Sequence, residues 1–272
     1  MNLLLVSGKN STKKMKQLFK FLLLPAIGIA LFSRCEQDHP SLPEPDDQIP
    51  KEVVIKPNDF LSGENYDRLI VEVASVKEFE PTGEALNNLK AFLESRLNKN
   101  GGIGVVPASI PSPGKAAYSL DDIKKIEQEY RTLFPDPEDK KLTAWFFFAD
   151  VDYAENEGDS KVLGIAYGPT SMVIFEKTVR EFSGERGQPS TPVLETTVTE
   201  HEFGHILGLV NNGTKMVVNH QDVTHGKHCN NPDCLMYWAA EHSGPVINFL
   251  TGGIIPALDQ NCLNDLITNG GK

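Results

Sequence analysis

The sequence predicts a mixed α/β fold in which a sheet leads into one helix that carries the functional side chains. Three observations support this class. Segments with strand-type patterns alternate with segments whose apolar residues recur at helical spacing. The last predicted strands are followed by a helical segment at residues 192–207 that contains two histidines four residues apart. Beyond that helix the chain is irregular up to a final apolar segment at residues 246–267.

The first half of the predicted domain has the order strand, helix, strand, helix. Residues 68–76 (RLIVEVASV) alternate and are rich in β-branched side chains, which is typical of a strand. Residues 83–98 place apolar side chains at helical spacing, and residues 103–106 predict a short second strand. A second helix is expected from residue 119 or 120 to residue 134.

Three more strands are predicted before the functional helix. Residues 142–149 (LTAWFFFA) form an apolar run without alternation, which is typical of a strand buried on both faces. We therefore expect this strand near the centre of the sheet. Residues 162–167 and 171–176 predict two further strands around a turn at Gly168 and Pro169.

The helix at residues 192–207 has start and stop signals at its two ends. Thr191 is suited to the N-cap position and Pro192 to the first helical position. Gly208 is suited to the position just after the helix, where a left-handed backbone is common.

Residues 1–34 have the organisation of a signal peptide. Four lysines between positions 13 and 20 precede an apolar stretch at residues 21–32. That stretch is shorter than the roughly 20 residues that a membrane-spanning helix needs. The segment from Leu31 to Cys35 (LFSRC) resembles a bacterial lipobox, which implies lipidation of Cys35. We expect export to the cell envelope or outer surface, with attachment to the membrane through this lipid.

Residues 35–57 are acidic and rich in proline, a composition that predicts an extended tether and not a packed core. Residues 58–272 then form one globular domain. Removal of residues 1–34 would change the formal net charge from -11 to -17, because six basic and no acidic residues leave. A surface of this charge repels nucleic acid, so we expect no nucleic-acid partner.

The string HEFGHILG at residues 201–208 predicts a zinc site. Side chains four residues apart lie on the same face of a helix, so His201 and His205 can bind one ion. Glu202 lies beside that ion, where it can act as a general base for a water molecule. Zinc suits this role because it polarises a carbonyl and lowers the pKa of its water to about 7.

A catalytic zinc ion usually has a third protein ligand, and three histidines are available. The pattern HExxHxxGxxH would place it at residue 211, which is Asn211 here. Without residues 211–227 the sequence continues as HEFGHILGLVHCNNPDCLMYW. We therefore favour His228 as the third ligand after a 17-residue insertion. His220 and His225, within the insertion, are the alternatives.

This spliced text resembles the metzincin zinc peptidases, and archaemetzincins most (HExxHxxGxxHCx4CxM). The resemblance covers roughly residues 191–238 by motif. It implies a zincin-like mixed sheet, a catalytic HExxH helix and an irregular C-terminal subdomain. It also implies that Met236 lies beneath the metal without binding it, and that the edge strand near residues 162–167 binds an extended peptide.

The resemblance bears on the cysteines as well. Archaemetzincins carry a second zinc site built from the two cysteines of HCx4C and a later CxxC. Only Cys262 follows here, so we expect no second zinc ion and instead a disulfide between Cys229 and Cys234.

Together these features predict a zinc-dependent endopeptidase that acts on a peptide or protein substrate. Two other functions stay open. A disturbed third ligand would suit a zinc-containing surface binding protein without turnover. A zinc hydrolase of a non-peptide amide, such as a cell-wall bond, uses the same groups.

Overall fold

A computed structural model describes residues 53–158, 160–250 and 253–272. The predicted signal peptide, most of the tether and the predicted lipidation site Cys35 lie outside these residues. Among the helices of the described ranges, none combines the length and the apolar composition that crossing a membrane requires.

The centre of the fold is a five-stranded sheet with the order β2-β1-β4-β7-β6. The pairs β1–β2, β1–β4 and β4–β7 are parallel, and β6 pairs antiparallel with β7 at one edge. The prediction of a mixed α/β fold is therefore confirmed. The bounds of the strands are β1 Arg68–Val76, β2 Gly102–Ile110, β4 Lys141–Phe148, β6 Gly164–Gly168 and β7 Ser171–Ile174.

Strand β4 occupies the middle of the sheet, as its apolar sequence predicted, and its side chains supply both faces. Phe146 and Phe148 join the larger core, while Trp145 and Phe147 join the smaller one. Because successive strand residues point to opposite faces, a run without polar residues is buried on both sides.

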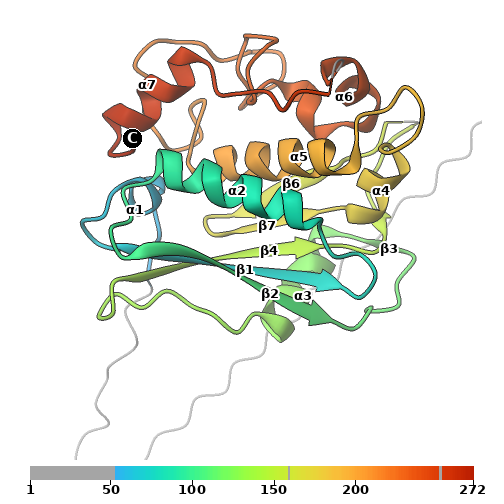
Figure 1. Ribbon diagram of the computed structural model, residues 1–272, viewed down its shortest axis with the longest axis horizontal. Coiled ribbons are helices and arrows are strands. Elements are labelled where there is room, and N and C mark those ends of the chain that lie inside the picture. The colour runs from blue at the N-terminus through green and yellow to red at the C-terminus, as the bar shows by residue number, and fades with distance from the viewer. Residues whose placement is uncertain (1–52, 159, 251–252) are drawn as a thin grey trace, which may run out of the picture. The chain divides into compact units, whose positions relative to one another are not determined.

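Helices cover both faces of this sheet (Figure 1). Helices α2 (Gly83–Arg96) and α5 (Thr191–Ile206) contribute to the larger core, and α3 (Leu120–Tyr130) contributes to the smaller one. Helix α5 contacts α2, β6 and β7. The functional helix therefore lies on the sheet beside its antiparallel edge.

Two predicted elements have different lengths in the structure. Strand β2 continues past Val106 through Pro107 and pairs with β1 along its whole length. An edge strand tolerates proline because the missing N–H faces away from the sheet. Helix α3 ends at Tyr130 and not at residue 134, because the backbone N–H groups of Thr132 and Leu133 donate to the buried Glu72 carboxylate at 3.1 and 2.9 Å.

Several short elements were not predicted. Helix α1 (Pro57–Leu61) and helix α4 (Glu176–Glu181) flank the sheet, and β3 (Ala117–Tyr118) pairs with β5 (Asp152–Tyr153). Ile55, which the composition placed in the tether, is buried in the larger core. The C-terminal part comprises the 3-10 helix η1 (Trp238–Glu241) and the helices α6 (Ser243–Phe249) and α7 (Gln260–Thr268).

Candidate metal centre

Helix α5 positions the HExxH residues, and it is buried on nearly every side. It begins at Thr191, one residue earlier than predicted, so Ser190 is the N-cap residue and Pro192 the second helical residue. The helix ends at Ile206, and Gly208 adopts a left-handed φ of 74° just beyond it. Buried threonines and glutamates on this helix, together with His201 and Glu202, show that the functional face points into the protein.

Three imidazoles converge at the C-terminal end of α5. The Nε2 atoms of His201 and His205 lie 3.1 Å apart. The ring of His228 lies 5.3 Å from that of His201 and 5.1 Å from that of His205. His201 is fully buried, and the side chains of His205 and His228 are 10% and 12% exposed. The structure thus brings together the three residues that the spliced motif proposes as ligands.

Backbone carbonyls orient two of these rings. His201 Nδ1 lies 2.7 Å from the carbonyl oxygen of Leu235, and His228 Nδ1 lies 2.6 Å from that of His225. A carbonyl oxygen only accepts, so each Nδ1 carries the proton and donates it. In the neutral form of either ring, Nε2 would then present its lone pair to the centre, which is the usual arrangement of metal-binding histidines.

Glu241, at the end of η1, is the fourth member of the cluster and was missed by the sequence reasoning. Its Oε1 lies 3.6 Å from the Nε2 atoms of His201 and of His205, and it contacts His228 Nε2. Burial raises the pKa of Glu241, but the three imidazoles lower it well below its usual range. The four ligand atoms lie within 4.8 Å of one another. The Nε2 atoms of the three imidazoles face one carboxylate oxygen of Glu241, so the four ligand atoms surround a point that suits a cation.

Glu202 lies beside this centre with one oxygen bonded and the other without a partner. The backbone N–H of Ala166 in β6 donates to Oε2 at 2.7 Å. Oε1 is buried and has no hydrogen-bond partner among the described residues. Burial, and then the nearby Glu241 carboxylate, raise the pKa of Glu202 well above its usual value. A buried carboxylate oxygen without a partner is costly, and such groups often mark functional sites.

The inserted segment folds so that His228 still reaches the centre. Gln221 and Cys229 form an antiparallel bridge, and the N–H of Asp222 donates to the carbonyl of His228 at 2.7 Å. Asn211, at the position of the expected third histidine, has a left-handed φ of 62° and lies outside the cluster.

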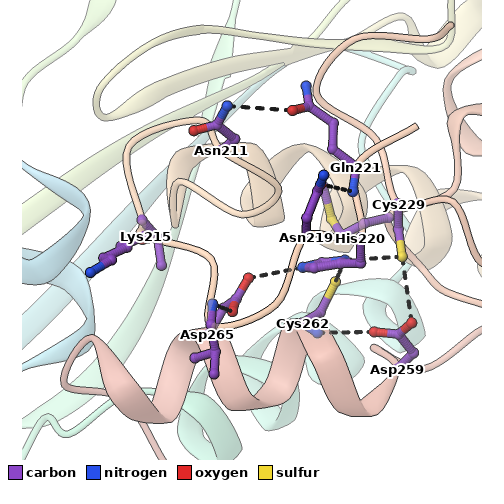
Figure 2. A network of polar contacts seen from close by, with 12 residues as sticks. Asn211, Lys215, Asn219, His220, Gln221, Cys229, Asp259, Cys262 and Asp265 are labelled. Atoms are coloured by element: carbon purple, nitrogen blue, oxygen red, sulfur yellow. Dashed lines mark hydrogen bonds and ion pairs between the residues drawn. The ribbon is translucent and has the colours of Figure 1, made fainter. Parts of the chain in front are cut away.

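The two other loop histidines do not join the three-histidine centre. His225 stacks on Trp238 with its ring centroid 4.3 Å away. His220 is buried in a separate cluster with Cys229 and Cys262, which Figure 2 shows. Of the three alternatives for a third ligand, the structure places only His228 beside His201 and His205.

Met236 lies against the helix at Gly204. A Cβ atom on Gly204 would lie 2.2 Å from Met236 Sδ, so the absence of a side chain there permits the contact. Met236 is completely buried. It directly follows Leu235, whose carbonyl oxygen accepts from His201, and it packs against helix α5 at Gly204.

The expected disulfide between Cys229 and Cys234 is not formed. Both residues and Cys262 are buried free thiols, and no disulfide joins them within the described ranges. The reason lies in the packing: Cys262 Sγ lies 3.7 Å from Cys234 Sγ, and His220 Nδ1 lies 3.3 Å from Cys229 Sγ. The prediction failed because the linear sequence did not show that Cys262 and His220 meet the pair.

Comparisons with known proteins give a likeness at the level of structure only. No protein-family model matches the chain, and no curated protein sequence matches it. Among solved structures, a zinc-dependent peptidase from Methanocorpusculum labreanum has 17% identity and a TM-score of 0.45, covering 72% of this chain and 99% of that one. An archaemetzincin from Methanopyrus kandleri has 13% identity and a TM-score of 0.46, covering 75% and 96%.

A third solved structure, metalloproteinase-II from Bacteroides fragilis, has 13% identity and a TM-score of 0.40, covering 75% of this chain and 54% of that one. Likeness at this level does not establish a family or an activity. The functional argument therefore rests on the geometry of the histidine cluster itself.

Proposed function

We propose that this chain is a zinc-dependent endopeptidase whose metal is held by His201, His205 and His228. One observation carries the proposal: three largely buried imidazoles converge on one point, and a carboxylate oxygen of Glu202 that has no partner among the described residues lies beside it. Three histidines are a familiar ligand set for catalytic zinc. A purely structural site has no need for a base next to the ion.

Zinc in this position would polarise a substrate carbonyl and lower the pKa of a water molecule to about 7. Glu202 would take the proton from the attacking water and pass it to the leaving amine. The N–H of Ala166 fixes one of its oxygens, so the other is the one that accepts the proton. Met236 supports the floor of the site without binding the metal.

The position of strand β6 at the sheet edge favours a peptide as the substrate. Its Ala166 N–H bonds to Glu202 and therefore points away from β7, toward the open edge. In an antiparallel strand, residues of the same parity present their N–H and C=O groups to the same side. Gly164 thus offers backbone groups to an added strand, which is how extended peptides bind sheet edges, while a bulge between Ala166 and Gly168 ends this alternation.

Glu241 favours one alternative, a zinc-containing surface protein without turnover. Three histidines and a carboxylate would give four protein ligands, which is typical of closed structural sites. In the enzyme, Glu241 must instead leave the fourth position to water and substrate. A Glu241→Gln variant separates the two cases, because it would raise cleavage in the enzyme and weaken zinc binding in the structural protein.

The central experiment compares Glu202→Gln with wild type for zinc content and for cleavage of an unfolded protein such as casein. We expect the variant to keep zinc and to lose cleavage. Glu200→Gln is the matched control, because Glu200 is a buried glutamate of the same helix that lies outside the cluster. Retained cleavage in Glu202→Gln would contradict the proposed base. Wild type that cleaves muropeptides and not casein would favour the non-peptide amide hydrolase.

The proposal includes export and lipid attachment through Cys35, which rest on residues 1–34 and the lipobox-like segment alone. Metabolic labelling with a radioactive fatty acid tests this. Label that is present in wild type and lost in Cys35→Ala would support the anchor. An unlabelled protein that is released in soluble form would contradict it.

A further inference from the structure

A second group of metal-binding side chains lies apart from the histidine centre. His220, Cys229, Asp259 and Cys262 have ligand atoms within 4.8 Å of one another, and Cys234 Sγ lies 3.7 Å from Cys262 Sγ. The three cysteines are completely buried, and His220 is 1% exposed. Figure 2 shows His220 in the inserted loop, Cys229 in the segment after it, and Asp259 and Cys262 at the start of α7.

Hydrogen bonds around Cys234 favour a thiolate. The backbone N–H groups of Met236 and Asp259 both point at its Sγ, at 3.4 and 3.3 Å. Two donors on one buried sulfur satisfy a negative charge better than a neutral thiol. Cys262 lies in the first turn of α7, which is nine residues long, and the positive end of the helix dipole also favours negative charge there. The surroundings therefore accommodate thiolates, the form that binds zinc.

A buried carboxylate orients His220. Its Nε2 lies 2.9 Å from Asp265 Oδ2, and the other Asp265 oxygen accepts the N–H of Val217 at 2.7 Å. His220 Nε2 therefore carries a proton and donates it, so the neutral ring that binds a metal would present the lone pair of Nδ1, which lies 3.3 Å from Cys229 Sγ. A carboxylate that fixes the far nitrogen of an imidazole is the common outer partner of a metal-binding histidine.

Asp259 is less suited to be a ligand because both of its oxygens have other partners. Oδ1 accepts the N–H of Cys262 at 2.9 Å as the N-cap of α7. Oδ2 accepts from Asn231 Nδ2 at 3.1 Å and from Cys229 Sγ at 3.4 Å. The remaining donors are three sulfurs and one nitrogen, which is a common set for structural zinc.

We propose that His220, Cys229, Cys234 and Cys262 form a second, structural zinc site. The three cysteines bind as thiolates, so those that still carry a thiol proton release it on binding, and the imidazole enters as the neutral form. The four ligands leave no open position, so the site has no catalytic role. His220 lies in the inserted segment 211–227, so the resemblance of the motifs does not imply this ligand set.

The second site would hold the catalytic ligand in place. Cys229 follows His228 directly in the chain, and Cys234 lies two residues before Met236. A metal that joins these cysteines to α7 and to the loop would fix the segment that delivers His228. The inference does not depend on peptidase activity, because the metal count and the cobalt spectrum test it alone.

The test is metal analysis of the full chain purified under reducing conditions, together with the absorption spectrum after cobalt substitution. We expect two zinc ions in wild type and in His225→Ala, the matched loop control. We expect one in Cys262→Ser and one in His228→Ala. The thiolate-to-cobalt charge-transfer band should survive in His228→Ala, because this substitution removes a ligand of the histidine centre only. The band should disappear in the Cys234→Ser, Cys262→Ser double variant.

Asp265→Asn provides a test that keeps every ligand, in case the cysteine variants do not fold. It should lower the affinity of the second site by about 10- to 100-fold. Asp259→Asn should leave the zinc affinity of the second site unchanged. One zinc ion in reduced wild type would overturn the proposal, and so would a charge-transfer band that is unaffected by the cysteine changes. Unchanged affinity in Asp265→Asn would overturn the role of His220.

Discussion

The contact between Gly204 and Met236 permits a quantitative test of how the helix packs over the centre. A Cβ atom added to Gly204 would lie 2.2 Å from Met236 Sδ and 3.1 Å from its Cε. Non-bonded heavy atoms prefer about 3.5–4.0 Å, so one side must move by more than about 1 Å. We therefore expect Gly204→Ala to destabilise the protein.

The magnitude follows from two opposing effects. Overpacking of a buried site typically costs about 1–3 kcal/mol. Replacing glycine by alanine inside a helix gains about 0.5–1 kcal/mol. Met236 has little freedom to retreat, because its carbonyl accepts the N–H of Cys229 at 2.7 Å. The net loss in unfolding free energy should be about 1–2 kcal/mol.

Urea unfolding of Gly204→Ala, Met236→Ala and the double variant measures this as a cycle. Shortening Met236 removes the colliding atoms, so the double variant should be more stable than the sum of the single effects by about 1–3 kcal/mol. Gly83→Ala is the control, because nothing lies within 4 Å of a Cβ atom there. Additive effects, or a Gly204→Ala variant as stable as wild type, would refute the packing argument.

Three further predictions concern other positions. Burial, and then Glu195, raise the pKa of Glu176 to about 9, from 4.5. The folded protein thus keeps a proton that the unfolded chain releases, and this stability is fully present below pH 4.5 and declines up to about pH 9. Urea unfolding at several pH values measures how steeply the unfolding free energy falls with pH. In Glu176→Gln this slope should be smaller by up to about 1.4 kcal/mol per pH unit, and an unchanged slope would refute the role of Glu176. Lys99 Nζ donates to three backbone carbonyls at 2.5–2.6 Å. Lys99→Met should cost about 3 kcal/mol of unfolding free energy, and a loss below about 1 kcal/mol would show that water replaces the ammonium group. A Cβ atom on Gly164 would lie 2.8 Å from Glu202 Cγ, so Gly164→Ala should reduce cleavage about 100-fold while zinc content stays the same; a loss of zinc would place the damage elsewhere.

Much of the fold was predictable because its main elements have strong local signals. The apolar run at 142–149 has no other suitable place than the middle of a sheet, where β4 lies. The pairing of His201 and His205 was predictable as well, because one helix is enough to place side chains four residues apart on the same face. The end of α3 was not predictable, because the Glu72 carboxylate that binds the following N–H groups lies 60 residues earlier in the chain.

The candidate site was predictable to the extent that motifs cover it. The motifs led to His228, because the sequence on both sides of the insertion joins across the gap, and the structure places this residue beside His201 and His205. Glu241 has no such signal, since it enters the centre from η1 through tertiary packing alone. The contact of Cys262 and His220 with the other cysteines was not predictable either, because α7 and the loop are brought together only in the folded chain.

The bridge between Gln221 and Cys229 has a consequence for the spacing of metal ligands in other sequences. The bridge closes residues 221–229 into one turn that carries His228, so the length of the inserted segment before Gln221 hardly affects where His228 lies. Doubling a flexible loop costs only about 0.6 kcal/mol of closure entropy. The interval between the second and third ligands is therefore free to drift, and sequence patterns with a fixed interval will overlook centres of this kind. A pattern that anchors the third histidine to the following cysteines and methionine would find them.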